Sequence, residues 1–112
     1  MADKTVRLRA AAAEDLDQAV DHLRDRAGER VALEFVESVA AAFSLLSSNP
    51  GIGSLRYSYD LEIPGLRAWP IERSDRAVFY VEADDHLDVW RVLHTRQDIP
   101  ATIEAPDSSP ET

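Results

Sequence analysis

The most informative absence in this sequence is that of cysteine, which excludes disulfide bonds and thiolate metal sites. Long hydrophobic runs are also missing, since no apolar stretch approaches the roughly 18 residues of a membrane span. The first residues, Met1–Lys4, lack the apolar core of a signal peptide. From these absences we expect a cytoplasmic protein that does not enter a membrane.

Positive charge is scarce in this chain and is carried almost entirely by arginine. Lys4 is the only lysine. The chain has 12 basic and 21 acidic residues, which gives a formal net charge of −9. Proteins that bind nucleic acid non-specifically neutralise its phosphates with Lys and Arg. We therefore expect no direct nucleic-acid binding. Arginines nevertheless recur between residues 65 and 98, toward the end of the chain.

Residues 11–48 have the hydrophobic spacing of two helices joined by a short turn near Ala27 and Gly28. Two acids near the start of this region, Glu14 and Asp15, are expected to favour a helix N-terminus by complementing its dipole. The chain is one domain by its length of 112 residues. The helices therefore need a partner surface within the same chain.

The later part of the chain changes to a period of two, which predicts strands. Pro70 lacks an N–H group, so its strand is expected at a sheet edge or at an irregularity. The predicted strands are residues 4–9, 66–72, 76–81 and 87–93, with 55–59 as a further strand or an extended loop.

These elements predict an α+β fold. An N-terminal strand precedes an antiparallel helical hairpin, which packs on one face of a three- to four-stranded antiparallel sheet. The opposite face is expected to stay partly open as a shallow groove. Residues 1–103 form this domain, and residues 104–112 are predicted to be a disordered acidic tail. Arg91 is predicted to share a face with Val89 and Leu93, so it must reach solvent or a carboxylate.

The last predicted strand ends in three polar side chains, His94, Arg96 and Asp98. Rigid strand ends often position binding or catalytic groups. The simpler interpretation is structural, with the Asp98 carboxylate accepting from Arg96 or His94 and pinning the strand. His22 and His86 are far from His94 in sequence, and we predict no metal site and no cofactor. No motif of ordinary metabolic catalysis is present.

Six short segments follow one another in an order that is specific as a set, although none is specific alone. The segments are Ala12–Leu16, Ala32–Phe35, Leu45–Gly53, Gly65–Arg67, Val78–Tyr80 and Arg91–Asp98. The set resembles the ParE branch of the RelE/ParE superfamily of bacterial toxin–antitoxin modules. The resemblance extends over residues 5–103, roughly the whole predicted domain.

The resemblance implies a toxin that is neutralised by a cognate ParD-like antitoxin, expected to be of the ribbon-helix-helix type. The C-terminal segment of such an antitoxin lies over the helical hairpin and the sheet. The resemblance also implies that DNA gyrase is the target, inhibited by protein–protein contact and without a catalytic site. Residues expected to contact antitoxin or target, or to close the sheet, are Arg67, Trp69, Arg73, Arg91, His94, Arg96 and Asp98.

Two alternatives stay open at this point. A RelE-type toxin would cleave mRNA on the ribosome, which requires an acid or base and cations at the scissile phosphate. The residues that could form such a site are Arg67, Arg76, Arg91, His94 and Arg96. The missing basic surface weighs against this activity. The acidic composition favours the second alternative, a non-toxic member that only binds the antitoxin.

Overall fold

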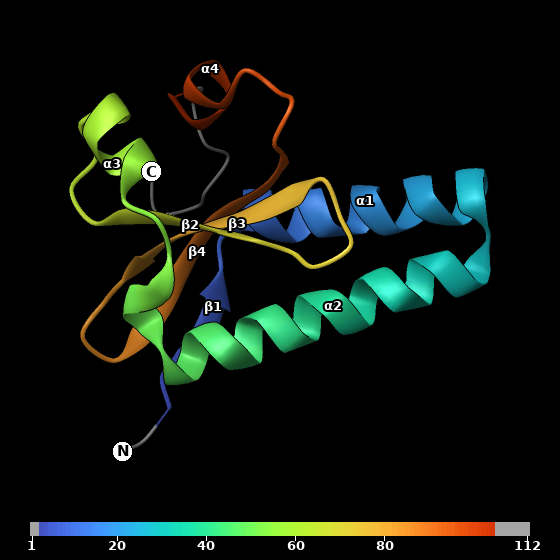
Figure 1. Ribbon diagram of the computed structural model, residues 1–112, viewed down its shortest axis with the longest axis horizontal. Helices are drawn as coiled ribbons and strands as arrows, with labels where there is room; N and C mark the ends of the chain where they lie inside the picture. The colour runs from blue at the N-terminus through green and yellow to red at the C-terminus, as the bar shows by residue number, and fades with distance from the viewer. Residues whose placement is uncertain (1–2, 105–112) are drawn as a thin grey trace.

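The computed structural model describes residues 3–104, which form one four-stranded sheet with helices on both faces (Figure 1). The elements are β1 (Thr5–Leu8), α1 (Ala10–Ala27), α2 (Glu29–Ser48), the 3₁₀ turn η1 (Pro50–Ile52), α3 (Arg56–Leu61), β2 (Leu66–Pro70), β3 (Arg76–Glu82), β4 (His86–His94) and α4 (Ile99–Glu104). The predicted α+β class and helical hairpin are confirmed. Apart from residue 104, the predicted tail lies outside the described residues.

The sheet has the order β1-β4-β3-β2 and is mixed. β2, β3 and β4 pair antiparallel as predicted, but β1 pairs parallel to β4, so the prediction of an all-antiparallel sheet is wrong. The reason is the helical hairpin, which returns the chain to the start of β1. There the Lys4 N–H donates to the Ser47 carbonyl at 3.1 Å. The direction of β1 is therefore set by the hairpin and not by a tight turn.

The helical hairpin of α1 and α2 covers one face of the sheet and forms the first core. Alanines at Ala12, Ala19 and Ala32 are almost fully buried, which lets the helices approach each other and the sheet closely. The larger residues of this core are Phe35, Val39, Leu46, Ile71, Val78, Tyr80, Leu87, Val89 and Val92. The buried apolar residues of α2 recur with the helical period that predicted this helix.

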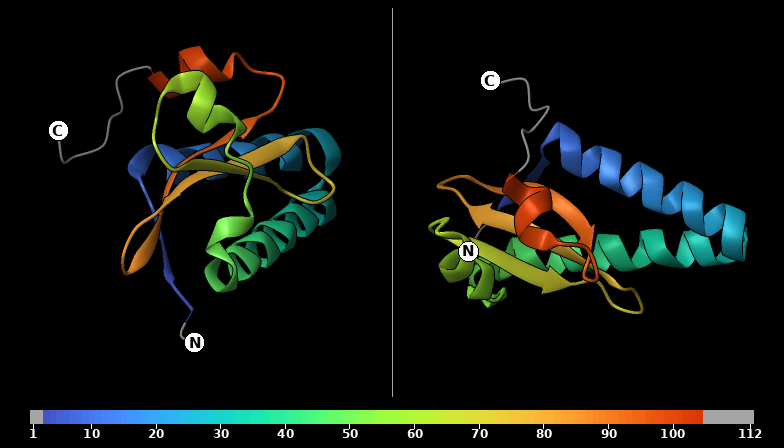
Figure 2. Two further views of the ribbon diagram at one scale, coloured as in Figure 1. Left: turned by 60° about the vertical axis from the view of Figure 1, so that its left-hand side comes forward. Right: turned by 90° about the horizontal axis from the view of Figure 1, so that it is seen from above.

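A second core lies on the other face of the sheet, beneath α3 and α4 (Figures 1 and 2). Phe79 is fully buried there and meets the ring of Tyr57 of α3 edge-on, with ring centroids 5.2 Å apart. Ile99 of α4 is also buried in this core. The prediction of a partly open face is therefore wrong, as is the strand or loop predicted at 55–59, which is helical. An uncovered Phe79 would leave a large apolar surface in water.

A bulge in β4 changes which side chains face each core. The pairing of β3 with β4 shifts between Phe79 and Tyr80, so that Trp90 is an extra residue in the ladder. Val89 consequently belongs to the first core and Leu93 to the second, although their spacing of four predicts a common face. The predicted shared face of the last strand is wrong for this reason.

Helix α2 is long and apolar enough, by length and composition alone, to cross a membrane. A third of its most apolar 18-residue stretch is buried inside the fold. The sequence has no unbroken apolar run of that length, because Glu34 and Glu37 interrupt the stretch. Part of this apolarity is explained by the first core, but Leu33, Val36 and Leu45 of α2 are exposed.

Tyr80 ties η1 to the sheet. Its hydroxyl donates to the Pro50 carbonyl at 2.7 Å and accepts from the Gly53 N–H at 3.1 Å. A Cβ at Gly53 would lie 2.6 Å from this hydroxyl, so the close approach requires glycine. Burial raises the pKa of Tyr80, which keeps the phenol neutral and able to donate. These bonds hold the segment between α2 and β2 against the sheet.

Candidate functional site

Arg91 pairs with Asp15 of α1 through two parallel bonds. The Arg91 Nε and Nη2 groups donate to Asp15 Oδ2 and Oδ1, both at 2.8 Å, and the Val92 N–H donates to Oδ2 at 3.0 Å. The side chains are 11% (Asp15) and 24% (Arg91) exposed. The expectation that Arg91 reaches solvent or a carboxylate is resolved in favour of a carboxylate.

Asp15 continues the sheet's bonding at the point where β1 ends. The last pair of the parallel ladder is Leu8 with Val89, and the Arg9 N–H donates to the Val89 carbonyl at 2.9 Å. Beyond it the edge of β4 is open, and the Asp15 carboxylate accepts the Val92 N–H. α1 begins at Ala10, and its first turn contains no acid. The role predicted for Asp15 at the helix start is therefore wrong.

His94 and Arg96 converge on Asp75 in the β2–β3 connection. His94 Nε2 lies 3.5 Å and Arg96 Nη2 lies 4.0 Å from Asp75 Oδ2. The Arg96 N–H donates to His94 Nδ1 at 3.1 Å, so Nε2 carries the proton of the neutral ring. Asp98 instead caps α4, where its Oδ1 accepts the Ala101 N–H at 3.2 Å. The prediction that Asp98 accepts from Arg96 or His94 is therefore wrong, because the carboxylate near these two side chains is that of Asp75.

Arg67 and Trp69 of β2 do not belong to the group around Asp75 and have other roles. The Arg67 Nη1 group donates to the carbonyls of Gly51 and Gly53 at 3.0 and 2.9 Å, which ties the loop after α2 to the edge strand. Trp69 is half-buried against the first core. The seven residues expected to contact a partner or to close the sheet therefore do not lie together. They divide among the ion pair with α1, the group around Asp75, the cap of α4 and the side of α2 that faces β2.

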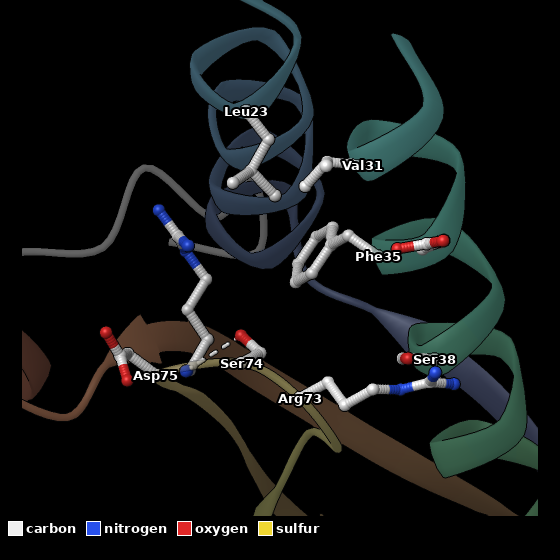
Figure 3. Close-up of a pocket in the computed structure, with 9 residues that line it drawn as sticks. Leu23, Val31, Phe35, Ser38, Arg73, Ser74 and Asp75 are labelled. Atoms are coloured by element: carbon white, nitrogen blue, oxygen red, sulfur yellow. Dashed lines mark hydrogen bonds between the residues drawn. The ribbon is translucent and has the colours of Figure 1, made fainter. Parts of the chain in front are cut away.

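Two adjoining cavities follow the side of α2 that faces the β2–β3 connection. The first, of about 290 Å³, has an apolar wall from Leu23, Val31 and Phe35 and a polar floor from the connection (Figure 3). The second, of about 450 Å³, has Leu45 on α2 and Trp69 on β2 among its lining residues. Both cavities are partly open to solvent. They form a single groove.

Ser38 and Arg73 line both cavities and mark the point where they join. In Figure 3 the Arg73 side chain extends along the floor toward Ser38 of α2. We call the two cavities together the α2 groove. It begins near Val31 and ends near Leu45, a helical rise of about 21 Å.

A third cavity, of about 450 Å³, is mostly polar and lies between α1 and the ends of β3 and β4. Arg76, Arg91 and His94 all line it, together with His22. The structure thus brings together three of the five residues considered for RNA cleavage. Arg67 is elsewhere, and the Arg96 side chain is 81% exposed beside Asp75. Within residues 3–104 no group of three or more metal-ligating side chains is present.

Comparison with known proteins identifies the family. A family model described as the ParE toxin of the type II toxin–antitoxin system, parDE, matches residues 6–99. This chain belongs to the ParE toxin family. The match begins within β1 and includes both helices of the hairpin and the whole of β2, β3 and β4. A search of curated proteins gave no match.

A solved structure supports the same fold for this ParE-family chain. It is described as the chromosomal ParDE TA system from P. aeruginosa, and it superposes with a TM-score of 0.67 at 24% sequence identity. The similarity covers 81% of this chain and 95% of the solved chain. At this level of identity the likeness establishes the fold alone. Family membership therefore rests on the match to the family model. The fold is supported by both comparisons.

Sequence reasoning missed two residues that this ParE-family fold depends on, Asp15 and Asp75. Neither has a local pattern that marks it, because their partners Arg91 and His94 lie 76 and 19 positions away in the chain. The only available signal was Arg91 itself, an arginine in an apolar strand that had to reach either solvent or a carboxylate. The α2 groove also escaped prediction, since it depends on how the β2–β3 connection lies beside α2.

Proposed function

We propose that this ParE-family chain is a cytoplasmic toxin that inhibits DNA gyrase by protein–protein contact and is neutralised by a ParD-like antitoxin. The α2 groove is the observation that carries the antitoxin part of the proposal. Family membership supports the toxin part. Gyrase is proposed because it is the target implied for this branch of the superfamily.

The α2 groove fits a helical segment of the antitoxin. Val31 and Leu45 of α2 line the groove and are 36% and 41% exposed, so this part of the helix is apolar but not buried by the fold. Apolar grooves of this kind bind the apolar face of an amphipathic helix. A groove of about 21 Å accommodates about four helical turns.

Addition of an antitoxin strand to β2 is less favourable, because the fold already occupies this edge. Ala68 exchanges both backbone hydrogen bonds with Ser54 at 2.9 Å, and the Leu66 N–H donates to the Ile63 carbonyl at 3.2 Å. Pro70 has no N–H group to offer. The edge position predicted for Pro70 is confirmed. A side-chain contact with the α2 groove is therefore the better mode of binding.

Inhibition by contact is supported over catalysis because two of the candidate arginines, Arg67 and Arg91, are already bonded within the fold. Arg91 is neutralised by the carboxylate of Asp15, and Arg67 is bonded to two carbonyls. A phosphate would have to compete with these partners for both guanidiniums. The second sheet face, which could offer a concave surface to RNA, is covered by α3 and α4.

Expression of this chain without its antitoxin should arrest growth, with filamentous cells and a DNA-damage response. The purified chain should inhibit DNA supercoiling by gyrase, because gyrase is the proposed target. Growth counts, microscopy and a supercoiling assay measure these effects. Growth arrest with intact DNA and cleaved mRNA would instead support a RelE-type activity. Normal growth combined with tight antitoxin binding would support a non-toxic member.

Replacing Leu45 by aspartate should abolish neutralisation by co-expressed antitoxin, because the change places a charge in the apolar part of the α2 groove. Cells that produce both proteins should then stop growing. Leu33→Asp is the matched control, since Leu33 is exposed on the same helix but lines neither cavity. Equal neutralisation of the two variants would contradict a binding site in the groove.

A further inference from the structure

Arg73 has a backbone conformation that its residue type does not favour. Its φ angle is +58°, in the left-handed region. Within residues 3–104 the only other non-glycine residue with positive φ is Glu62, which terminates α3, a position where this conformation is common. Arg73 instead lies in the β2–β3 connection, where glycine would have the lower cost. Strain of this kind often marks a functional position.

The conformation of Arg73 places its side chain where the two cavities of the α2 groove join. Arg73 lines both cavities, and Arg76 lines the first beside it. Within residues 3–104 neither guanidinium has a carboxylate within 4.0 Å. Arg76 lies over the ring of Phe35, 5.8 Å from its centroid, which orients it without neutralising it. Two unneutralised arginines therefore face the first cavity of the groove.

Two acids also line the first cavity, but each has a cation elsewhere. Glu34 faces Arg30 at 4.0 Å, and Asp75 lies next to His94. When a partner fills the groove it removes water from the two unneutralised guanidiniums. Desolvation of a cation is unfavourable unless the partner supplies an acceptor.

We propose that Arg73 and Arg76 form a carboxylate-binding pair, and that the antitoxin segment in the α2 groove carries an aspartate or glutamate where it passes the first cavity. This inference rests on the proposed antitoxin binding. The segment has apolar side chains toward Leu45 and Trp69 and an acid toward the β2–β3 connection. The acid selects the direction in which the segment lies in the groove, since the second cavity is mostly apolar and is also lined by the acid Glu72.

The decisive variant is Arg73→Gly, which separates binding from folding. Glycine adopts positive φ without strain, so the melting temperature of the free chain should stay the same or rise. The dissociation constant for the antitoxin encoded beside the toxin gene should increase about tenfold to a hundredfold. Calorimetric titration measures the affinity, and a thermal melt measures the stability.

Glu62→Gly is the matched control, because it relieves the same kind of strain away from the groove. This variant should melt at the same or a higher temperature and bind the antitoxin with unchanged affinity. The affinity of the unmodified chain should also fall with added salt more steeply than that of Arg73→Gly, which has lost one charge pair.

Three results would overturn the carboxylate pair. One is an equal dissociation constant for Arg73→Gly, Glu62→Gly and the unmodified chain. Another is tighter binding of the antitoxin by Arg73→Glu, which would show that the segment presents a cation instead. The third is no binding by the unmodified chain. That result would refute the proposed antitoxin partner itself, and the carboxylate pair with it.

Discussion

Replacing Asp15 by alanine should lower the free energy of unfolding by about 2–4 kcal/mol, because it removes a largely buried bidentate ion pair. The carboxylate accepts two N–H groups of Arg91 and the backbone N–H of Val92. With alanine at this position, the open edge of β4 loses this acceptor and Arg91 loses its compensating charge. Urea denaturation at neutral pH measures the change.

Asp17→Ala is the control for this prediction, since Asp17 is an exposed acid on the same helix. Its loss should stay within about 0.5 kcal/mol. A double-mutant cycle that combines Asp15→Ala with Arg91→Ala should give a coupling of about 0.5–3 kcal/mol. Additive losses in that cycle would mean that the two side chains do not stabilise each other.

Replacing Phe79 by alanine should cost about 3–5 kcal/mol, because it opens a cavity in the second core. Phe79 is fully buried and supports α3 through the edge of the Tyr57 ring. Amide hydrogen exchange in α3 should accelerate more than exchange in α2, since α3 has few other contacts with the fold. Denaturation and hydrogen exchange together measure the effect.

Phe43→Ala provides the comparison for this core. Phe43 is only half-buried, at the margin of the first core, so its truncation should cost less than that of Phe79. If the two variants lose the same stability, the second core contributes less than its burial indicates. Unchanged exchange in α3 would separately show that Phe79 does not hold this helix.

The strand-end segment Arg91–Asp98 illustrates how far the sequence leads toward the candidate site. An arginine within an apolar strand was expected to reach either solvent or a carboxylate, and a carboxylate is present. The sequence could not specify Asp15 as that carboxylate, because an acid in an alanine-rich helix has no distinctive pattern. Asp98, the acid nearest to Arg96 in the chain, was the wrong choice as acceptor for Arg96 or His94, since it is used to cap α4.

Face assignment along β4 failed for a different reason. Alternation with a period of two holds only while the ladder is regular, and the bulge at Trp90 interrupts it. None of the residue types in this stretch indicates a bulge. One extra residue was enough to move Leu93 from the predicted face to the opposite core.

The sequence by itself determined the helical hairpin, the three antiparallel strands and the resemblance to the ParE family. These features depend on periodicity and on short ordered segments, both of which are local. Only the tertiary structure decided the parallel direction of β1, the second core and the α2 groove with Arg73 at its centre. Each of these depends on which distant segments come together when the chain closes. Local patterns do not specify which distant segments come together, because many arrangements of the same helices and strands are compatible with the same local patterns.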